Sequence, residues 1–166
     1  MRPGSEGPAR SSQRGFTYLG LLLIVAAMGV GMAAFGELAS HAAQREKEAE
    51  LLFVGDAYRE AIRQYYESSP AGHKRYPTSL EQLLKDDRFS FNRRHLRRLY
   101  RDPVTGKDWA AVEAPEGGIM GVRSISEAAP VKSGEFPAGY EAFEGALRYA
   151  DWQFVYSPLP APAAAR

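Results

Sequence analysis

An uncharged, mostly apolar run extends from Phe16 to Gly36 and is bounded by Arg14 and Glu37. At about 1.5 Å per residue, a helix of about 21 residues rises roughly 31 Å, the thickness of a bilayer's hydrocarbon core. A helix is the expected spanning form because it satisfies its own backbone polar groups. The pattern therefore predicts a transmembrane helix over residues 16–36, and the length of the run disfavours a buried core helix.

Residues 37–68 form a second periodic stretch, with no proline and with Gly55 as its only glycine. Its apolar positions recur at steps near 3.6, which predicts an amphipathic helix packed on a domain. They are not a sustained heptad repeat, so a coiled coil is disfavoured. No breaker separates the two stretches, so one helix of about 50 residues, roughly 75–80 Å long, is expected to end at residues 68–72. The predicted core positions of the second stretch are Leu38, Ala42, Ala49, Leu52, Phe53, Ala57, Ile62 and Tyr65.

The rest of the chain, residues 69–156, has the pattern of a small α+β domain. Alternating and β-branched residues predict strands, and Pro and Gly mark the turns between them. The aromatic set Trp109, Trp152, Phe154 and Tyr156 is expected to pack a small antiparallel sheet against the long helix. The Pro/Ala-rich residues 157–166 predict a loose tail. The predicted elements are short helices at 78–84 and 91–101 (the latter with Leu96, Leu99 and Tyr100 inward), turns at 102–108 and 115–118, strands at 109–112, 119–125 and 149–156, and a long irregular stretch at 128–148.

Composition and charge narrow the function classes. The chain has 166 residues, a net charge of +1 and no cysteine. About 130 residues follow the apolar run and suffice for one modest domain, and near-neutral charge argues against a nucleic acid partner. Five arginines cluster over residues 93–101; we interpret them as a solvated face, or as partners for acidic groups on neighbouring subunits, rather than as a nucleic-acid patch.

Basic residues also predict the orientation of the span. Three arginines precede it with only Glu6 against them, whereas two basic residues alternate with three glutamates over residues 45–50. The positive-inside tendency places the N-terminus in the cytoplasm and the C-terminal domain outside the inner membrane, which in a bacterium is the periplasm.

No pattern of catalytic chemistry stands out. His41, His73 and His95 lack metal-motif spacing and a local catalytic triad pattern, so each is predicted to lie on the surface. There is no phosphate-binding loop, and the function is predicted to be non-enzymatic. No cofactor is expected; calcium stays open, because loop carboxylates suit hard cations, but no ligand residues are assigned.

The junction Arg14-Gly15-Phe16-Thr17-Tyr18-Leu19, followed by the apolar run, resembles the processing site of type IV pilins and type II secretion pseudopilins. The resemblance implies that residues 1–15 are a leader, that prepilin peptidase cuts between Gly15 and Phe16, and that Phe16 is then N-methylated. Gly20 departs from the family, which usually has glutamate at the fifth mature position to pair with a neighbouring subunit's N-terminal amine. This departure favours a minor or specialised subunit.

Later motifs extend the resemblance over most of residues 14–156. Tyr76-Pro77-Thr78 before a Leu-rich helix and the Asp102-Pro103 turn before the sheet are similar to pseudopilin motifs, as are residues 118–122 and 151–156. The implied fold is pilin-like: a long helix, with a membrane half (16–36) and an amphipathic half (37–68), packed on a small sheet within 69–156. The implied partners are prepilin peptidase, other pilin or pseudopilin subunits and an inner-membrane assembly platform.

Two other interpretations of the N-terminal region stay open. In the first, the span is a conventional signal peptide that is removed near Ala34-Phe35-Gly36, although its apolar run is longer than usual. In the second, the span is an anchor that is never processed, and the chain is a single-pass periplasmic binding or scaffold module that does not polymerise. The sequence does not select among secretion, adhesion, motility and uptake.

Overall fold

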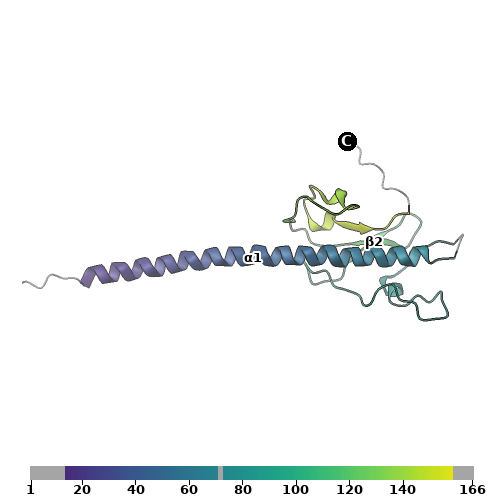
Figure 1. Ribbon diagram of the computed structural model, residues 1–166, viewed down its shortest axis with the longest axis horizontal. Helices are drawn as coiled ribbons and strands as arrows, with labels where there is room; N and C mark the ends of the chain where they lie inside the picture. Colours follow the sequence, from purple (N-terminus) through teal and green to yellow (C-terminus); the bar gives the residue numbers. More distant parts are fainter. Residues whose placement is uncertain (1–13, 71–72, 159–166) are drawn as a thin grey trace, which may run out of the picture. The chain divides into compact units, whose positions relative to one another are not determined.

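The computed structural model describes residues 14–70 and 73–158; within its long helix, the side chains of residues 14–17 and 30–40 lie outside the description. Its architecture is α+β, with one long helix and a three-stranded antiparallel sheet (Figure 1). Contacts divide the chain into two compact units, unit 1 (Met1–Ala42) and unit 2 (Ala43–Arg166). The elements in order are α1 (Arg14–Glu67), the 3-10 turn η1 (Leu80–Leu83), β1 (Ala110–Glu113), β2 (Ile119–Arg123), the 3-10 turns η2 (Glu141–Phe143) and η3 (Tyr149–Asp151), and β3 (Gln153–Val155).

The prediction of one long helix is confirmed, since α1 has 54 residues. It ends at Glu67, one residue before the predicted stop signal. There the Ser68 hydroxyl donates to the Tyr65 carbonyl at 3.0 Å, and Pro70 follows closely. Helix ends leave their last carbonyls without helical partners, so this bond satisfies one of them.

The core-facing stripe of α1 in unit 2 differs from the prediction. Ile62 and Tyr65 are buried as predicted, and Leu52 and Ala57 are partly buried against the core. The prediction is wrong for Phe53, which is 72% exposed, and for Ala42 and Ala49, which are also exposed. The side chain of Leu38 lies outside the described residues. Apolar residues occupy two faces of this helix, so hydrophobic periodicity alone did not identify the buried one. The buried stripe consists of Leu51, Val54, Tyr58, Ile62 and Tyr65, at steps of three and four.

The three strands form a sheet in the order β1–β2–β3, with antiparallel pairing throughout. Val122 in the central strand lies opposite Ala111 on one side and Phe154 on the other. The first strand was predicted one residue too early, and the other two were predicted at the right places but too long. Residues 149–151 form η3 instead of strand, because the Asp151 carboxylate accepts the backbone N–H of Arg148 and curls the chain.

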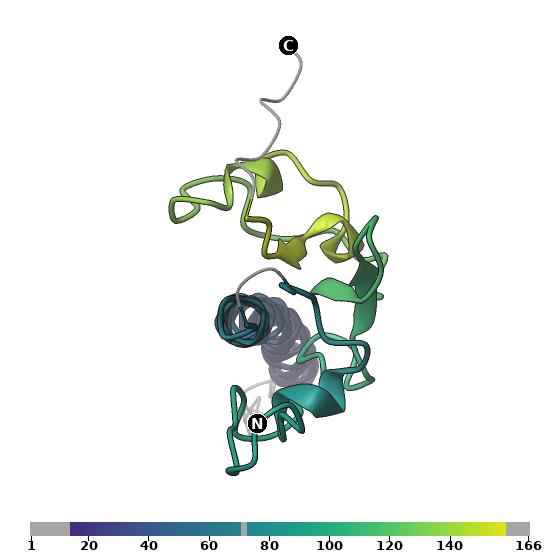
Figure 2. The same cartoon turned by 90° about the vertical axis from the view of Figure 1, so that its right-hand side faces the viewer.

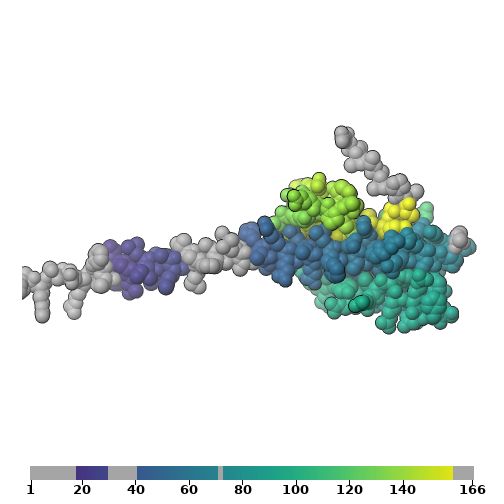
Figure 3. Space-filling view, viewed as in Figure 1, coloured from purple at the N-terminus to yellow at the C-terminus, as the bar shows by residue number. Residues whose placement is uncertain are grey.

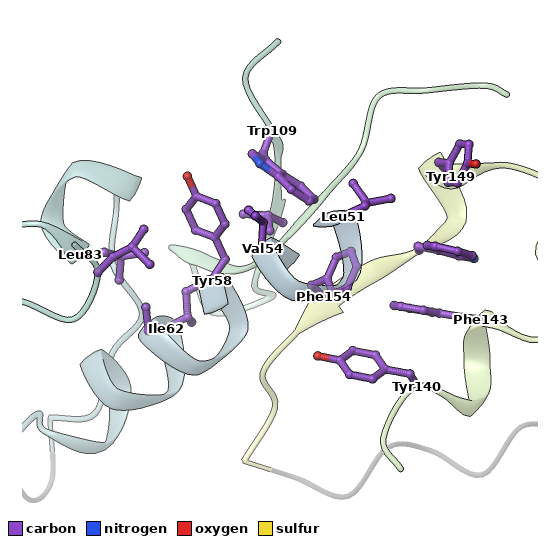
Figure 4. Packing of buried hydrophobic residues seen from close by; sticks show 14 of the residues in the cluster. Leu51, Val54, Tyr58, Ile62, Leu83, Trp109, Tyr140, Phe143, Tyr149 and Phe154 are labelled. Carbon is purple, nitrogen blue, oxygen red and sulfur yellow. The ribbon is translucent and has the colours of Figure 1, made fainter. Parts of the chain in front are cut away.

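Phe154 is the centre of the aromatic core between the sheet and α1 (Figure 4). Its ring centroid lies 5.9 Å from that of Trp109 and 5.2 Å from that of Phe143, both in edge-to-face geometry. Gly55 of α1 faces this ring, since a Cβ atom there would come within 2.5 Å of it. The predicted packing role is thus confirmed for Trp109, Trp152 and Phe154, which are buried. Tyr156 is half-buried at the edge.

Both predicted turns are present. The buried Asp102 carboxylate accepts the Val104 N–H at 2.9 Å and the Ser124 hydroxyl at 2.7 Å, which ties the first turn to the chain just after β2. In the second turn Gly118 has a φ of +85°, which favours glycine, and lies against Tyr76. These turns align β1 and β2.

The short helix predicted over residues 91–101 is absent, and that prediction is wrong. The backbone N–H groups of His95 and Leu96 both donate to the Leu83 carbonyl at 2.9 Å, so the segment bonds to the end of η1 rather than to itself. Leu96 is buried as predicted, but Leu99 is exposed. The other predicted short helix is present as η1, where the Gln82 side chain bonds the Thr78 backbone and hydroxyl.

Candidate functional site

The predicted cleavage junction coincides with the beginning of α1. The helix begins at Arg14, so Gly15 and Phe16 lie in its first turn. Residues 1–13 of the predicted leader lie outside the described residues, as do the side chains of residues 14–17. The predicted scissile bond is therefore at the N-terminal end of a helix.

Beyond this junction, α1 exposes a series of large apolar side chains. Tyr18, Leu19, residues 21–25 and Met28 are each between 48% and 66% exposed. Successive helical residues are about 100° apart, so five consecutive ones face every side. A helix that is apolar all round is expected to be surrounded by apolar protein or lipid.

Among the described residues, no helical segment combines the length and apolar character needed to cross a bilayer. In the span predicted over residues 16–36, the side chains of residues 16, 17 and 30–36 lie outside the description. The transmembrane helix therefore stays a prediction from the sequence.

Gly20 occupies the position where the pilin resemblance expects glutamate. A Cβ atom placed there meets nothing within 4 Å. Packing within the described chain thus does not require glycine at this position. Any role for Gly20 depends on what surrounds α1, since small residues allow close approach of helices in a membrane.

A buried cluster of charged side chains packs against the C-terminal end of α1. Arg88 Nε and Nη2 donate to the Asp86 carboxylate at 2.7 and 2.6 Å, and His95 Nε2 lies 3.0 Å from Asp86 Oδ2. Arg88 Nη2 also donates to the Tyr65 carbonyl at 2.8 Å, in the last turn of α1. The cluster therefore fixes the helix end to residues 86–95.

The prediction that His95 lies on the surface is wrong, because its side chain is 1% exposed. It stacks edge-on with Tyr65 and its Nε2 contacts Asp86, a partner that sequence spacing did not reveal. His41 and His73 are exposed, as predicted. All polar atoms of the Asp86 carboxylate are used within the chain, so the cluster is structural.

Asp86 makes the stability of unit 2 depend on pH. Burial by itself raises the pKa of Asp86, but hydrogen bonds from Arg88 and His95 outweigh it and lower the pKa from 3.8 to about 2. A carboxyl whose pKa falls on folding stabilises the native state above its unfolded pKa, and this contribution is lost as pH drops through the folded value. We expect the unfolding free energy to fall by about 2 kcal/mol between about pH 5 and about pH 2 through this group. Urea unfolding across that range checks this, and an Asp86→Asn variant with the same pH dependence would contradict it.

Glu48 anchors the long segment 128–148 to α1. Its carboxylate accepts the N–H groups of Val131 at 2.5 Å and Lys132 at 3.2 Å, and the Tyr149 hydroxyl at 3.0 Å. Sequence reasoning missed this residue, although a glutamate in phase with Leu51 on the core face was a usable signal. A hollow of about 580 Å³ lies beside it, between α1 and residues 131–135.

This hollow is lined by Arg45, Glu48, Ala49, Leu52, Val131, Lys132, Ser133, Gly134 and Glu135. In the described part of the chain, no group of three or more His, Asp or Glu side chains is placed to hold a metal ion. No calcium ligands are therefore assigned.

Comparison with known protein families, with characterised proteins and with solved structures returned no match to this chain.

Proposed function

We propose that this chain is a structural subunit of a type II secretion pseudopilus or a type IV pilus-like filament, with a pilin-like fold. The observation that carries the proposal is the position of the junction Arg14-Gly15-Phe16 at the first turn of a helix that continues with apolar side chains on every side. A conventional signal peptide would not need to continue into a helix that forms part of the folded domain. The observed helix continues to Glu67 and supplies the core of unit 2.

In this proposal each part of α1 has a separate task. The apolar residues 16–36 hold the subunit in the inner membrane before assembly, and unit 2 lies in the periplasm. Prepilin peptidase removes residues 1–15, and the Phe16 amine becomes methylated. In the filament, apolar helices of neighbouring subunits pack on one another and replace lipid contacts.

Gly20 gives the subunit a specialised role in this proposal. Without a carboxylate at this position, the usual charge partner of the N-terminal amine is missing. Since the described surroundings leave room for a longer side chain, steric crowding within the chain does not account for glycine. We infer a specialised subunit, recruited by the assembly platform through other contacts.

A Gly15→Val substitution tests the processing step. We expect the variant to keep its leader in cells that contain prepilin peptidase, because the branched side chain occupies the position where the family requires glycine. Immunoblotting of membrane fractions would show a slower band for Gly15→Val than for the native chain. Gly20→Val is the matched control and should be processed normally. Equal processing of Gly15→Val and the native chain would contradict the proposal.

A further inference from the structure

Unit 2 carries two exposed segments of opposite charge. We define the basic segment as residues 91–101, which contain no carboxylate, and the acidic segment as residues 133–147, which contain no lysine or arginine. The charges of the basic segment are Arg93, Arg94, Arg97, Arg98 and Arg101, and those of the acidic segment are Glu135, Glu141 and Glu144.

The arginines of the basic segment form no ion pair with a carboxylate among the described residues, whereas four arginines elsewhere in unit 2 do. Arg59, Arg63, Arg88 and Arg148 each form an ion pair with a carboxylate. Among the ion pairs found between described residues, none involves an arginine of the basic segment. The three glutamates of the acidic segment are exposed and likewise take no part in these pairs. The two segments thus carry charges of opposite sign that take no part in these ion pairs.

Each segment also exposes a large apolar side chain. Phe91 in the basic segment is 62% exposed, and Leu147 in the acidic segment is 79% exposed. Apolar and aromatic side chains flanked by arginine are typical of protein–protein interfaces rather than of a solvated face. The basic segment therefore has the composition of a contact surface, and the acidic segment offers the opposite charge together with one exposed apolar side chain.

The two segments lie on opposite sides of the part of α1 that belongs to unit 2. In Figures 1 and 2 the teal chain that includes the basic segment lies on one side of α1, and the yellow-green chain that includes the acidic segment lies on the other. The space-filling view shows the surface of α1 uncovered between them (Figure 3). The segments therefore cannot neutralise each other within one copy.

We propose that the basic segment of one copy binds the acidic segment of a second copy of this chain. The contact joins two different patches, so it is heterologous: each copy keeps one patch of each kind free, and the contact can repeat in one direction. It deepens the proposed function, on which it rests, by naming a second copy as a neighbour in the assembly. Exposed ion pairs are individually weak, so this contact sets the orientation and register of neighbouring copies rather than supplying most of the binding energy. Confinement of the copies in one membrane raises their local concentration and so favours their association.

Cross-linking in cells tests this contact, because the native chain contains no cysteine. Asn92→Cys and Ala142→Cys place thiols at exposed positions in the two segments without removing a charge. A bifunctional maleimide added to membranes of the full-length double variant should give a ladder of dimers, trimers and larger species. Each single-cysteine variant should stay monomeric, whereas a symmetric contact would give dimers from a single cysteine and would overturn the proposal.

Charge reversal then tests the mechanism. In the double-cysteine background, Arg94→Glu, Arg97→Glu and Arg98→Glu together should reduce the ladder by about tenfold, and so should Glu135→Arg with Glu144→Arg. The three arginine reversals leave the basic segment with a net charge of −1, and the two glutamate reversals leave the acidic segment with a net charge of +1. Glu141 is left unchanged because its carboxylate accepts the Gly139 N–H. Lys47→Glu, Lys74→Glu and Lys107→Glu together change the net charge as much as the arginine reversal does and should leave the ladder intact. An unchanged ladder in the reversed variants would overturn the proposal.

Co-expression gives a result that loss of folding cannot mimic. The arginine-reversed chain carrying only Asn92→Cys and the glutamate-reversed chain carrying only Ala142→Cys should cross-link to each other as a dimer, because their reversed segments are complementary. Thermal unfolding measurements check that both chains are folded. If both are folded and this pair gives no dimer, the proposed contact is overturned. Leader removal is scored in the same samples by band mobility: processing without a ladder removes only this inference, and a ladder without processing removes only the proposed function.

Discussion

Replacing Asp86 with alanine should lower the free energy of unfolding by about 3–5 kcal/mol, because breaking a buried ion pair leaves the opposite charge without compensation. The Asp86 carboxylate is 0% exposed and accepts hydrogen bonds from Arg88 and contacts His95. Its loss leaves the Arg88 guanidinium, which also bonds the Tyr65 carbonyl, without its counter-ion. Urea unfolding of the detergent-solubilised full chain, followed by tryptophan fluorescence, measures the change.

The neighbouring residue supplies a matched control. Asp87 pairs with Lys85, but both side chains are more than 70% exposed. Exposed ion pairs contribute little, so Asp87→Ala should change the unfolding free energy by less than about 1 kcal/mol. Equal effects of Asp86→Ala and Asp87→Ala would show that the cluster does not hold the end of α1.

Replacing Phe154 with alanine should cost about 3–5 kcal/mol, because it removes a fully buried ring and leaves a cavity. The ring lies between Gly55 of α1 and the rings of Trp109 and Phe143, so its loss removes a packing contact between the sheet and the helix. The same fluorescence-detected urea unfolding measures this change.

Phe53→Ala is the control for Phe154→Ala, because the chemical change is identical and Phe53 is exposed on the other face of α1. Its effect should stay within about 0.5 kcal/mol. If Phe53→Ala destabilised the chain as much as Phe154→Ala, the assignment of the buried face of α1 would be wrong.

The elements that depend on local sequence were predictable. The long helix followed from the absence of breakers between residues 16 and 67. The turns followed from the Asp102 side chain, which bonds its own backbone, and from Gly118, which adopts a positive φ. Strand positions followed from alternation, but the length of the third strand did not, because the curl at Asp151 depends on a side-chain contact with Arg148.

What could not be predicted depends on contacts distant in sequence. Residues 91–101 have a helical spacing, but their backbone bonds to Leu83. The choice between Phe53 and Leu51 as the buried position of α1 depends on which face the sheet covers, and the burial of His95 depends on Asp86. The predicted cleavage at Gly15 is a feature of sequence recognised by an enzyme, so the fold of this chain does not test it.

Leader removal is the central claim, and intact mass spectrometry of the membrane-extracted protein tests it most directly. The protein is prepared from cells with and without prepilin peptidase. The proposal predicts a chain that begins at N-methylated Phe16 only when the peptidase is present. A full-length chain in both preparations would contradict it and leave an anchored periplasmic domain, and a chain that begins near Glu37 would contradict it by showing that the apolar run is a removable signal.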